Sequence, residues 1–359
     1  MTIVENLLVG TDLGLTGLSG VPRAAGPQKV KDYTSDQEVR WCPGCGDYVI
    51  LATVRGFLAE LGLERENLMF VSGIGCSSRF PYYLEAYGIH SIHGRAPAIA
   101  TGMAVTRPDL SVWVVTGDGD ALSIGGNHLI HALRRNVNMT ILLFNNRIYG
   151  LTKGQYSPTS ETGKVTKSTP MGSIDHPFNT LSVALGAEAT FAARALDSDR
   201  AGLTEVLRAA AEHRGTAFVE ILQDCPIFND GSFDALRREN AESHLVRLRH
   251  GQPIRFGADN EFAVVRDGFG LKVARADSVA ESDIVVHDAY TDQPEYAYAL
   301  SRLSDQDLTH VVTGVFRSVT RPTYDDGVRA QLGTAVERKP VSPNSLQELL
   351  TGNETWTVG

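Results

Sequence analysis

The stretch SVWVVTGDGD, residues 111–120, places an acidic glycine turn directly after a run of apolar residues. The run predicts a buried strand at residues 112–115, and a helical pattern follows at about 124–135. Glycines let a backbone approach a phosphate without a Cβ in the way, and a helix that begins near Ser123 points free N–H groups at that phosphate. The stretch therefore predicts a strand, a phosphate-binding turn and a helix.

Similar apolar runs recur along the chain, and amphipathic stretches separate them. The runs predict strands at residues 68–71, 112–115, 139–144 and 218–222, with helices at 47–62, 97–106, 124–135, 177–186 and 199–213. Alternation of this kind is typical of a mainly parallel sheet with helices on both faces, so the predicted fold class is α/β. We expect an N-terminal arm at 1–35, a main domain at 36–235 and a C-terminal extension at 236–359 that includes a strand-rich stretch.

Oxygen-bearing side chains follow two of the predicted strands. Asp118 follows the strand at 112–115, and Asn145-Asn146 follows the next strand about 25 residues later. Ligands of parallel sheets bind at the carboxyl ends of the strands, where these residues fall. Asp118, the Asn146 side chain and the Ile148 carbonyl offer hard oxygens that suit Mg²⁺, with a diphosphate providing the remaining ligands. The alternative is two unrelated turns at strand ends.

The four cysteines, Cys42, Cys45, Cys76 and Cys225, require an explanation other than disulfides if the chain works in a reducing compartment. Four thiolates suit either tetrahedral zinc or a [4Fe–4S] cluster, and the spacing alone does not choose between them. Only Cys42 and Cys45 form a close pair, and Pro226 follows Cys225, which is more typical of cluster ligation. A buried cysteine that acts as a small hydrophobic residue is the alternative.

The composition is that of a globular protein, and the net charge of −9 gives no bulk attraction to nucleic acid or to an anionic membrane. No apolar run reaches the roughly 18 to 20 residues that a membrane span needs. The N-terminus lacks the basic and then apolar layout of a secretory signal. We therefore expect a cytoplasmic protein without a nucleic-acid or membrane partner.

Several separated motifs occur in an order that resembles the β subunit of 2-oxoacid:ferredoxin oxidoreductases. The resemblance covers roughly residues 35 to 235 and is carried by Trp41-Cys42-Pro43-Gly44-Cys45-Gly46, Gly73-Ile74-Gly75-Cys76-Ser77, His93-Gly94-Arg95, Gly117-Asp118-Gly119-Asp120 and the run from Asn145 to Gln155. It implies a thiamine-diphosphate-binding fold for residues 36–235, with the cofactors thiamine diphosphate, Mg²⁺ and a [4Fe–4S] cluster.

The resemblance also implies a reaction and partners. The family oxidatively decarboxylates a 2-oxoacid with coenzyme A and gives acyl-CoA, carbon dioxide and two reduced ferredoxins. The glutamate that activates thiamine comes from an α subunit in this family, and the chain lacks the cysteines of a fused ferredoxin domain. We expect an α subunit and a separate ferredoxin as partners, in an (αβ)₂ heterotetramer.

Site residues carried over from the family fall into three sets. The cluster set is Cys42, Cys45, Cys76 and Cys225, and the Mg²⁺ set is Asp118, Asn146 and Ile148. The thiamine-lining set is Ile74, Gly75, Cys76, Ser77, His93, Gly94, Arg95, Gly117, Gly119, Asp120, Gly150 and Leu151. For His93 a catalytic contact and a structural role are both open, and Arg95 could equally serve in an ion pair.

Lys153 indicates which 2-oxoacid the chain accepts. Family enzymes for pyruvate tend to carry glycine there, and the lysine version resembles enzymes that accept 2-oxoglutarate. An ammonium near the reacting carbon can pair with the distal carboxylate that pyruvate lacks, although most lysines are simply solvated. We expect 2-oxoglutarate and coenzyme A as substrates and succinyl-CoA as product. The alternatives are pyruvate or another 2-oxoacid, a non-redox thiamine decarboxylase with structural zinc, and a zinc-stabilised binding module.

Overall fold

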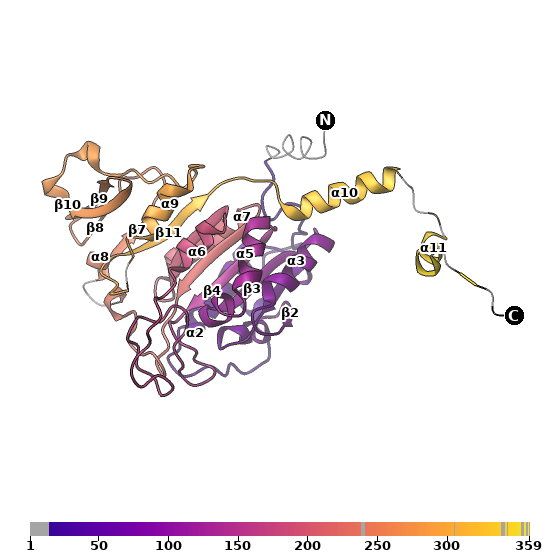
Figure 1. The fold of residues 1–359 in the computed structure, drawn as a ribbon, viewed down its shortest axis with the longest axis horizontal. Helices are drawn as coiled ribbons and strands as arrows, with labels where there is room; N and C mark the ends of the chain where they lie inside the picture. The colour runs from indigo at the N-terminus through magenta and orange to yellow at the C-terminus, as the bar shows by residue number, and fades with distance from the viewer. Residues whose placement is uncertain are drawn as a thin grey trace.

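An eight-stranded sheet runs through the chain, in the order β2-β1-β3-β4-β6-β5-β11-β7 (Figure 1). The computed structural model describes residues 14–237, 241–304, 306–338, 342, 344–352, 355–356 and 358. The strands are β1 (Leu68–Ser72), β2 (Tyr87–His90), β3 (Ser111–Gly117), β4 (Met139–Asn145), β5 (Phe191–Leu196), β6 (Thr216–Leu222), β7 (Leu245–Arg247) and β11 (Val311–Ser318). The strands from β2 to β5 pair in parallel, which confirms the predicted α/β class.

Helices cover both faces of the sheet and enclose two separate cores. On one face α2 (Asp47–Leu61) packs beside α7 (Arg200–Glu212). On the other face lie α3 (Ala96–Thr106), α5 (Gly126–Arg135) and α6 (Thr180–Gly186). The central strands β3 to β6 are buried on both faces, so their sequences read as continuous apolar runs. All four predicted strands and all five predicted helices occur, with bounds shifted by a few residues.

The turn at Gly117 differs from the prediction. The strand β3 continues to Gly117, and the short helix α4 (Asp118–Leu122) begins at Asp118 itself rather than near Ser123. Carboxylates are favoured in the first turn of a helix, where free N–H groups carry positive potential. The chain then bends before α5, and a Cβ on Gly125 would lie 2.4 Å from the Asp120 carbonyl oxygen. The glycine therefore permits the bend that separates α4 from α5.

The predicted C-terminal extension is not a separate layer. Its strands β7 and β11 extend the main sheet, and β11 pairs antiparallel with β5. Between β7 and β11 lies a small antiparallel sheet of β8 (Arg255–Phe256), β9 (Phe262–Asp267) and β10 (Gly270–Arg275). The region also contains the helices α8 (Ala241–His244) and α9 (Pro294–Ser301). The main sheet therefore continues past the boundary predicted at residue 236, through β7 and β11.

Short 3₁₀ helices connect these elements. They are η2 (Val30–Tyr33), η3 (Arg65–Asn67), η4 (Ser77–Tyr83), η5 (Asp234–Leu236), η6 (Ala276–Ser278) and η7 (Glu281–Asp283). The described part of the predicted N-terminal arm packs on this chain, because Leu18, Val21 and Tyr33 are buried in the core beside α2 and α7. Residues 1–13 of the arm lie outside the described residues.

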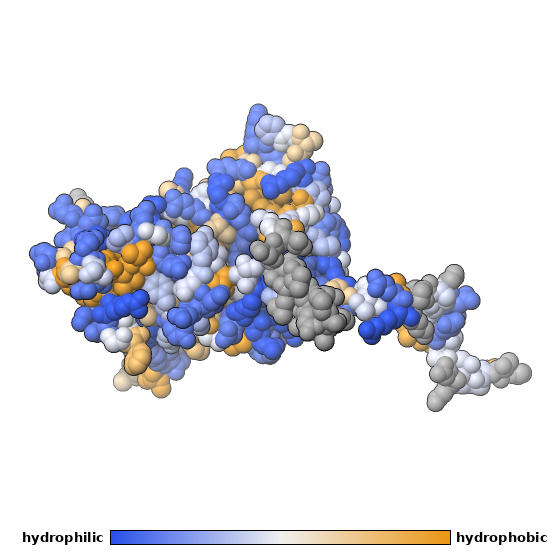
Figure 2. Space-filling view, turned by 90° about the horizontal axis from the view of Figure 1, so that it is seen from above, coloured by the Kyte–Doolittle hydropathy of each residue, from blue (hydrophilic) through white to orange (hydrophobic). Residues whose placement is uncertain are grey.

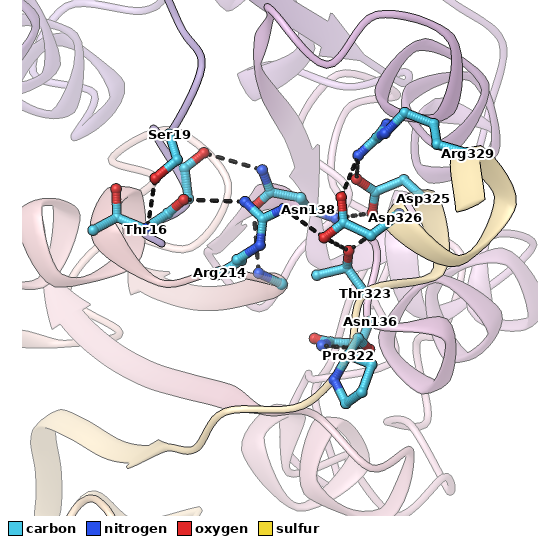
Figure 3. A network of polar contacts seen from close by, with 12 residues as sticks. Thr16, Ser19, Asn136, Asn138, Arg214, Pro322, Thr323, Asp325, Asp326 and Arg329 are labelled. Atoms are coloured by element: carbon cyan, nitrogen blue, oxygen red, sulfur yellow. Dashed lines mark hydrogen bonds and ion pairs between the residues drawn. The ribbon is translucent and has the colours of Figure 1, made fainter. Parts of the chain in front are cut away.

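Helices α10 (Tyr324–Arg338) and α11 (Ser345–Thr351) lead away from the body (Figures 1 and 2). A polar network joins the start of α10 to Asn138, the residue before β4 (Figure 3). Asp325 accepts a hydrogen bond from the Asn138 backbone N–H at 3.0 Å and pairs with Arg329, and the Asn138 side chain donates to the Gly17 carbonyl at 3.0 Å. No helix in the described part of the chain has the length and apolar character to cross a membrane.

A buried ion pair joins the middle strands. Arg194 of β5 lies opposite Glu220 of β6, with 2.6 Å between Nε and Oε2. Burial alone would raise the pKa of Glu220, but the Arg194 charge and neighbouring hydrogen bonds hold it below its usual range. Arg194 also donates to the Ser304 hydroxyl at 2.8 Å, so the pair links the sheet to the segment before β11.

We expect Arg194→Met to lower the free energy of unfolding by about 3–5 kcal/mol, because the change leaves the Glu220 carboxylate buried without its counter-charge. Urea unfolding followed by circular dichroism measures the difference. The double variant Arg194→Met/Glu220→Gln should recover much of the loss, since it removes the unpaired charge. A single variant as stable as the wild type would contradict this role.

A buried histidine makes stability depend on pH. His213 is 9% exposed, its Nε2 lies 2.8 Å from the Thr190 hydroxyl, and burial lowers its pKa to about 4. An unfolded histidine takes up its proton near pH 6.5, so the unfolded state binds more protons between pH 6.5 and 4. Stability contributed by neutral His213 is therefore present above pH 6.5 and lost as the pH falls towards 4.

We expect the wild-type stability to fall more steeply than that of His213→Gln between pH 6.5 and 4, by up to about 3 kcal/mol. Glutamine keeps a hydrogen-bonding side chain but does not titrate. Thermal or urea unfolding at a series of pH values measures both slopes. Parallel slopes for the two proteins would show that His213 is not the titrating group.

Candidate functional site

The loops that carry the predicted site residues lie at one edge of the sheet. They follow β1, β2, β3, β4 and β6, which are neighbours in the sheet and point the same way. Their carboxyl ends therefore meet, and the loops that leave them gather at this edge (Figure 1). The turn with Cys42 and Cys45 instead precedes α2.

Asp118 occupies the start of α4 and is 2% exposed. Its Oδ2 accepts hydrogen bonds from the Ser157 hydroxyl at 2.5 Å and the Thr159 hydroxyl at 2.6 Å. Burial raises the pKa of this carboxyl to about 6, while the two hydroxyls act in the opposite direction. A buried carboxylate at a strand end, without a cationic side chain among these partners, fits a divalent cation.

The two asparagines at the end of β4 have different surroundings, since Asn145 is the last residue of the strand and Asn146 follows it. Asn145 is buried in the sheet, where its Nδ2 donates to Glu220 at 2.7 Å and its Oδ1 accepts from the Thr159 hydroxyl at 2.9 Å. Asn146 lies further out, and its Oδ1 accepts from the Ile148 backbone N–H at 3.2 Å. The turn requires a left-handed residue, and Arg147 provides it with φ 57°. Asn146 and Ile148, the predicted Mg²⁺ ligands, thus share one turn.

Asp120 holds the adjacent loops together. Its Oδ1 accepts from the Gly94 N–H at 2.7 Å and the Ile74 N–H at 3.2 Å, and its Oδ2 accepts from the Thr116 hydroxyl at 2.7 Å. Its Oδ1 also contacts Nδ1 of His93, whose side chain is 41% exposed. Asp120 therefore joins the loops that carry other predicted thiamine-lining residues and contacts the His93 ring.

Glycines keep this region closely packed. A Cβ on Gly119 would lie 2.2 Å from the Tyr149 ring, and a Cβ on Gly94, where φ is 71°, would lie 2.6 Å from the Gly125 backbone. The Arg95 guanidinium donates to the His93 carbonyl at 2.9 Å. Any larger residue at Gly94 or Gly119 would push the loops apart, so these positions fit a surface where a phosphate approaches backbone.

The four cysteines lie at the same edge, from three separate loops. Cys42 and Cys45 precede α2, Cys76 precedes η4, and Cys225 follows β6. The Cβ position of Gly150 is 3.5 Å from the Cys76 sulfur and 3.6 Å from the Cys225 sulfur. Burial raises the pKa of Cys45 and Cys225 and raises that of Cys76 to about 12; the Asp47 carboxyl adds to this effect at Cys45 and Cys76, and neighbouring thiols add to it at all three.

The donor set fits a cluster of thiolate ligands. Backbone N–H groups of residues 227–229 point at Cys225 and favour its thiolate form. All four cysteines are free thiols. In the described part of the chain, no three His, Cys, Asp or Glu side chains converge on a position for a single metal ion. Each thiolate of a [4Fe–4S] cluster binds a different iron, so its cysteines surround a larger volume than those of a zinc site.

Lys153 lies on the tight loop after β4. Its backbone N–H donates to the Gly150 carbonyl at 3.0 Å, and its φ is 76°. Its side chain is exposed, and no described residue forms an ion pair or hydrogen bond with its ammonium. Leu151 of the same loop is 41% exposed. The ammonium is therefore available to a ligand at this edge.

Ser157 and Thr159 are site residues that sequence reasoning missed. They lie in a long loop without helices or strands between β4 and α6, where no periodicity marks them. A second missed feature is a cavity of about 1010 Å³ between α7 and β11. It contains none of the predicted site residues, so its size does not make it the functional centre.

Comparisons with known proteins give a consistent assignment. Residues 73–221 match the family described as thiamine pyrophosphate enzyme, C-terminal TPP binding domain. The 2-oxoglutarate oxidoreductase subunit KorB of Mycobacterium tuberculosis is 72% identical over 362 residues, which cover 100% of this chain and 97% of that protein. The 2-oxoacid:ferredoxin oxidoreductase 2, subunit beta of Aeropyrum pernix is 45% identical over 55% of this chain and 64% of its own length.

A solved structure agrees with these relatives. It is the 2-oxoglutarate:ferredoxin oxidoreductase from Magnetococcus marinus with 2-oxoglutarate, coenzyme A and succinyl-CoA bound, which matches with a TM-score of 0.72 and 35% identity. The match covers 92% of this chain and 99% of that chain. The chain therefore belongs to the family of 2-oxoglutarate oxidoreductase KorB subunits, which are beta subunits of the 2-oxoacid:ferredoxin oxidoreductases.

Proposed function

We propose that this chain is the β subunit of a 2-oxoglutarate:ferredoxin oxidoreductase. The reaction converts 2-oxoglutarate, coenzyme A and two oxidised ferredoxins into succinyl-CoA, carbon dioxide, a proton and two reduced ferredoxins. The supporting observation is that one sheet edge carries both a buried Asp118 carboxylate and four free thiols. The substrate is supported by the printed names of the relative from M. tuberculosis and the structure from M. marinus.

The residues at the edge have separate tasks in this proposal. Asp118, the Asn146 side chain and the Ile148 carbonyl would hold Mg²⁺, and the hydroxyls of Ser157 and Thr159 keep the Asp118 carboxylate in place. Thiamine diphosphate supplies the electron sink that cleavage of a 2-oxoacid requires. Asp120 would hold the loop of Gly94, which lines the thiamine diphosphate, and would orient the ring of His93.

Cys42, Cys45, Cys76 and Cys225 would hold a [4Fe–4S] cluster, whose contribution is to carry electrons one at a time. The thiols must lose their protons to act as ligands, and the N–H groups near Cys225 stabilise the resulting charge. Both centres lie at the same edge of one sheet, so the protein needs no large movement to bring them together.

The site is completed by an α subunit in this proposal, in an (αβ)₂ assembly that works in the cytoplasm with a separate ferredoxin. Exposed apolar side chains on the loop between β4 and α6 support an interface there. Met171 is 95% exposed, Ile174 is 92% exposed and Val165 is 65% exposed. Apolar side chains gathered on one exposed loop are typical of a surface that a partner covers.

Anaerobic purification of the chain with its co-purifying partner allows a direct test. We expect reduction of a low-potential viologen that requires both 2-oxoglutarate and coenzyme A, with no reduction when pyruvate replaces 2-oxoglutarate. Reduction with pyruvate alone would keep the enzyme class and overturn the substrate. Thiamine-loaded protein that reduces nothing with any 2-oxoacid would overturn the redox function and favour a non-redox decarboxylase.

Lys153 gives a sharper test of the substrate. We expect Lys153→Gly to lower kcat/KM for 2-oxoglutarate by about 10- to 100-fold, because a charge-assisted contact with the distal carboxylate is lost. Glycine adopts the φ of 76° without strain, so the loop is preserved. Lys153→Arg should retain most activity, and Lys272→Gly, at an exposed position on β10 of the small sheet, should have no effect. An equal loss with 2-oxoglutarate and pyruvate would show that Lys153 does not select the substrate.

A further inference from the structure

One buried side chain touches both candidate centres. Gln223 follows β6 and is 1% exposed. Its Oε1 accepts a hydrogen bond from Nδ2 of Asn146 at 3.0 Å, and its Nε2 donates to the sulfur of Cys45 at 3.2 Å. The amide thus lies between a predicted Mg²⁺ ligand and a predicted cluster ligand.

The orientation of this amide is determined by its neighbours. Nε2 also donates to the Asp224 carbonyl oxygen, so two acceptors face the nitrogen and one donor faces the oxygen. A reversed amide would place Oε1 against a carbonyl oxygen and a sulfur, and Nε2 against the Asn146 amino group. The Gln223 backbone N–H donates to the Asn145 carbonyl at 2.9 Å, which ties the residue to the end of β4.

Gln223 packs closely against the turn that contains Gly46. A Cβ on Gly46 would lie 3.0 Å from Cγ of Gln223 and 1.9 Å from Oδ2 of Asp197. The Gly46 N–H donates to the Asp224 carbonyl at 3.1 Å. The glycine after Cys45 therefore allows the cysteine turn and the end of β6 to approach each other, and Gln223 fills the contact.

We propose that Gln223 is a positioning residue that couples the two centres, orienting Asn146 towards the metal and stabilising the Cys45 sulfur of the cluster by a hydrogen bond. This inference rests on the proposed function. It assigns one side chain a role at both sites, with the oxygen serving Asn146 and the nitrogen serving Cys45.

The contact with Asn146 determines which end of that amide is free for a cation. Because Nδ2 is held by Gln223, Oδ1 points away from Gln223, towards the turn that contains Ile148. Groups that orient metal ligands in this way typically change metal affinity by 10- to 100-fold when they are removed. Loss of the Gln223 oxygen should therefore weaken Mg²⁺ binding.

The contact with Cys45 acts on the cluster. The Cys45 side chain is buried, and Nε2 of Gln223 lies 3.2 Å from its sulfur. A hydrogen bond to a cluster sulfur stabilises the reduced form, which carries more negative charge, and so raises the reduction potential. Loss of the Gln223 nitrogen should therefore lower the potential of the cluster.

Two variants separate the contact of Gln223 with Asn146 from its contact with Cys45. Gln223→Met removes the donor and the acceptor at similar volume, whereas Gln223→Glu keeps an oxygen for Asn146 and places a carboxylate against Cys45. The control is Gln252→Met, at an exposed position remote from the site. Each protein is purified without air together with its partner subunit. The cluster potential is measured by redox titration with electron paramagnetic resonance, and the Mg²⁺ requirement by equilibrium dialysis of thiamine diphosphate.

We expect Gln223→Met to shift the reduction equilibrium by about tenfold towards the oxidised cluster, which is about 59 mV for one electron. The Mg²⁺ concentration for half-maximal thiamine diphosphate binding should rise by about tenfold. Gln223→Glu should lower the potential further while its Mg²⁺ requirement stays near that of the wild type. The control should match the wild type in both measurements.

Unchanged potential and unchanged Mg²⁺ requirement in Gln223→Met, with a normal cluster signal in the wild type, would overturn the inference and leave the proposed function intact. If Gln223→Met fails to fold, Gln223→Glu carries the test, and an unchanged potential in that variant would also overturn the inference. A wild-type complex without any cluster signal would overturn the inference and the proposed redox function together.

Discussion

The ion pair between Arg194 and Glu220 connects the sheet, the C-terminal region and the site. Arg194 reaches the Ser304 hydroxyl, and Glu220 accepts from Asn145, whose own oxygen accepts from Thr159. The single hydroxyl proton of Thr159 is shared between that oxygen and Oδ2 of Asp118. Two charges buried in a sheet are tolerated only when each finds its hydrogen-bonding partners. These contacts provide such partners, and they form a continuous network from the centre of the sheet to Asp118, the candidate metal ligand.

Parallel pairing explains why so many distant residues share one edge. The strands β1, β3, β4 and β6 end together, so each loop that leaves them can contribute a ligand, an orienting group or a glycine contact. The strand β4 is central to this arrangement because its last residue, Asn145, contacts the buried pair, and Asn146, which follows it, belongs to the candidate site. The thiols belong to the same edge, since Cys76 follows β1 and Cys225 follows β6. The topology therefore brings the proposed cofactor ligands and the four thiols to the same edge.

Most of the central strands were predictable from the sequence, and the strands and contacts that were not have physical causes. The strands that read as apolar runs were predicted because burial on both faces requires such residues. The strand β5 was missed because Arg194 interrupts its sequence, and β11 because it comes from a charged region far along the chain. Asp118 and the cysteines could be singled out as candidates because they lie in short sequence motifs. The contacts of Ser157 and Gln223 could not, since they depend on loops that only the folded chain brings together.

The central claim is that this chain itself holds both a thiamine diphosphate and an iron-sulfur cluster. Analysis of iron, zinc, sulfide and thiamine in the anaerobically purified complex tests it most directly, with Cys76→Ser measured beside the wild type. The account predicts one thiamine diphosphate for each copy of this chain and about four irons that Cys76→Ser loses, with no stoichiometric zinc. Zinc in place of iron, or an iron content that Cys76→Ser leaves unchanged, would contradict the account.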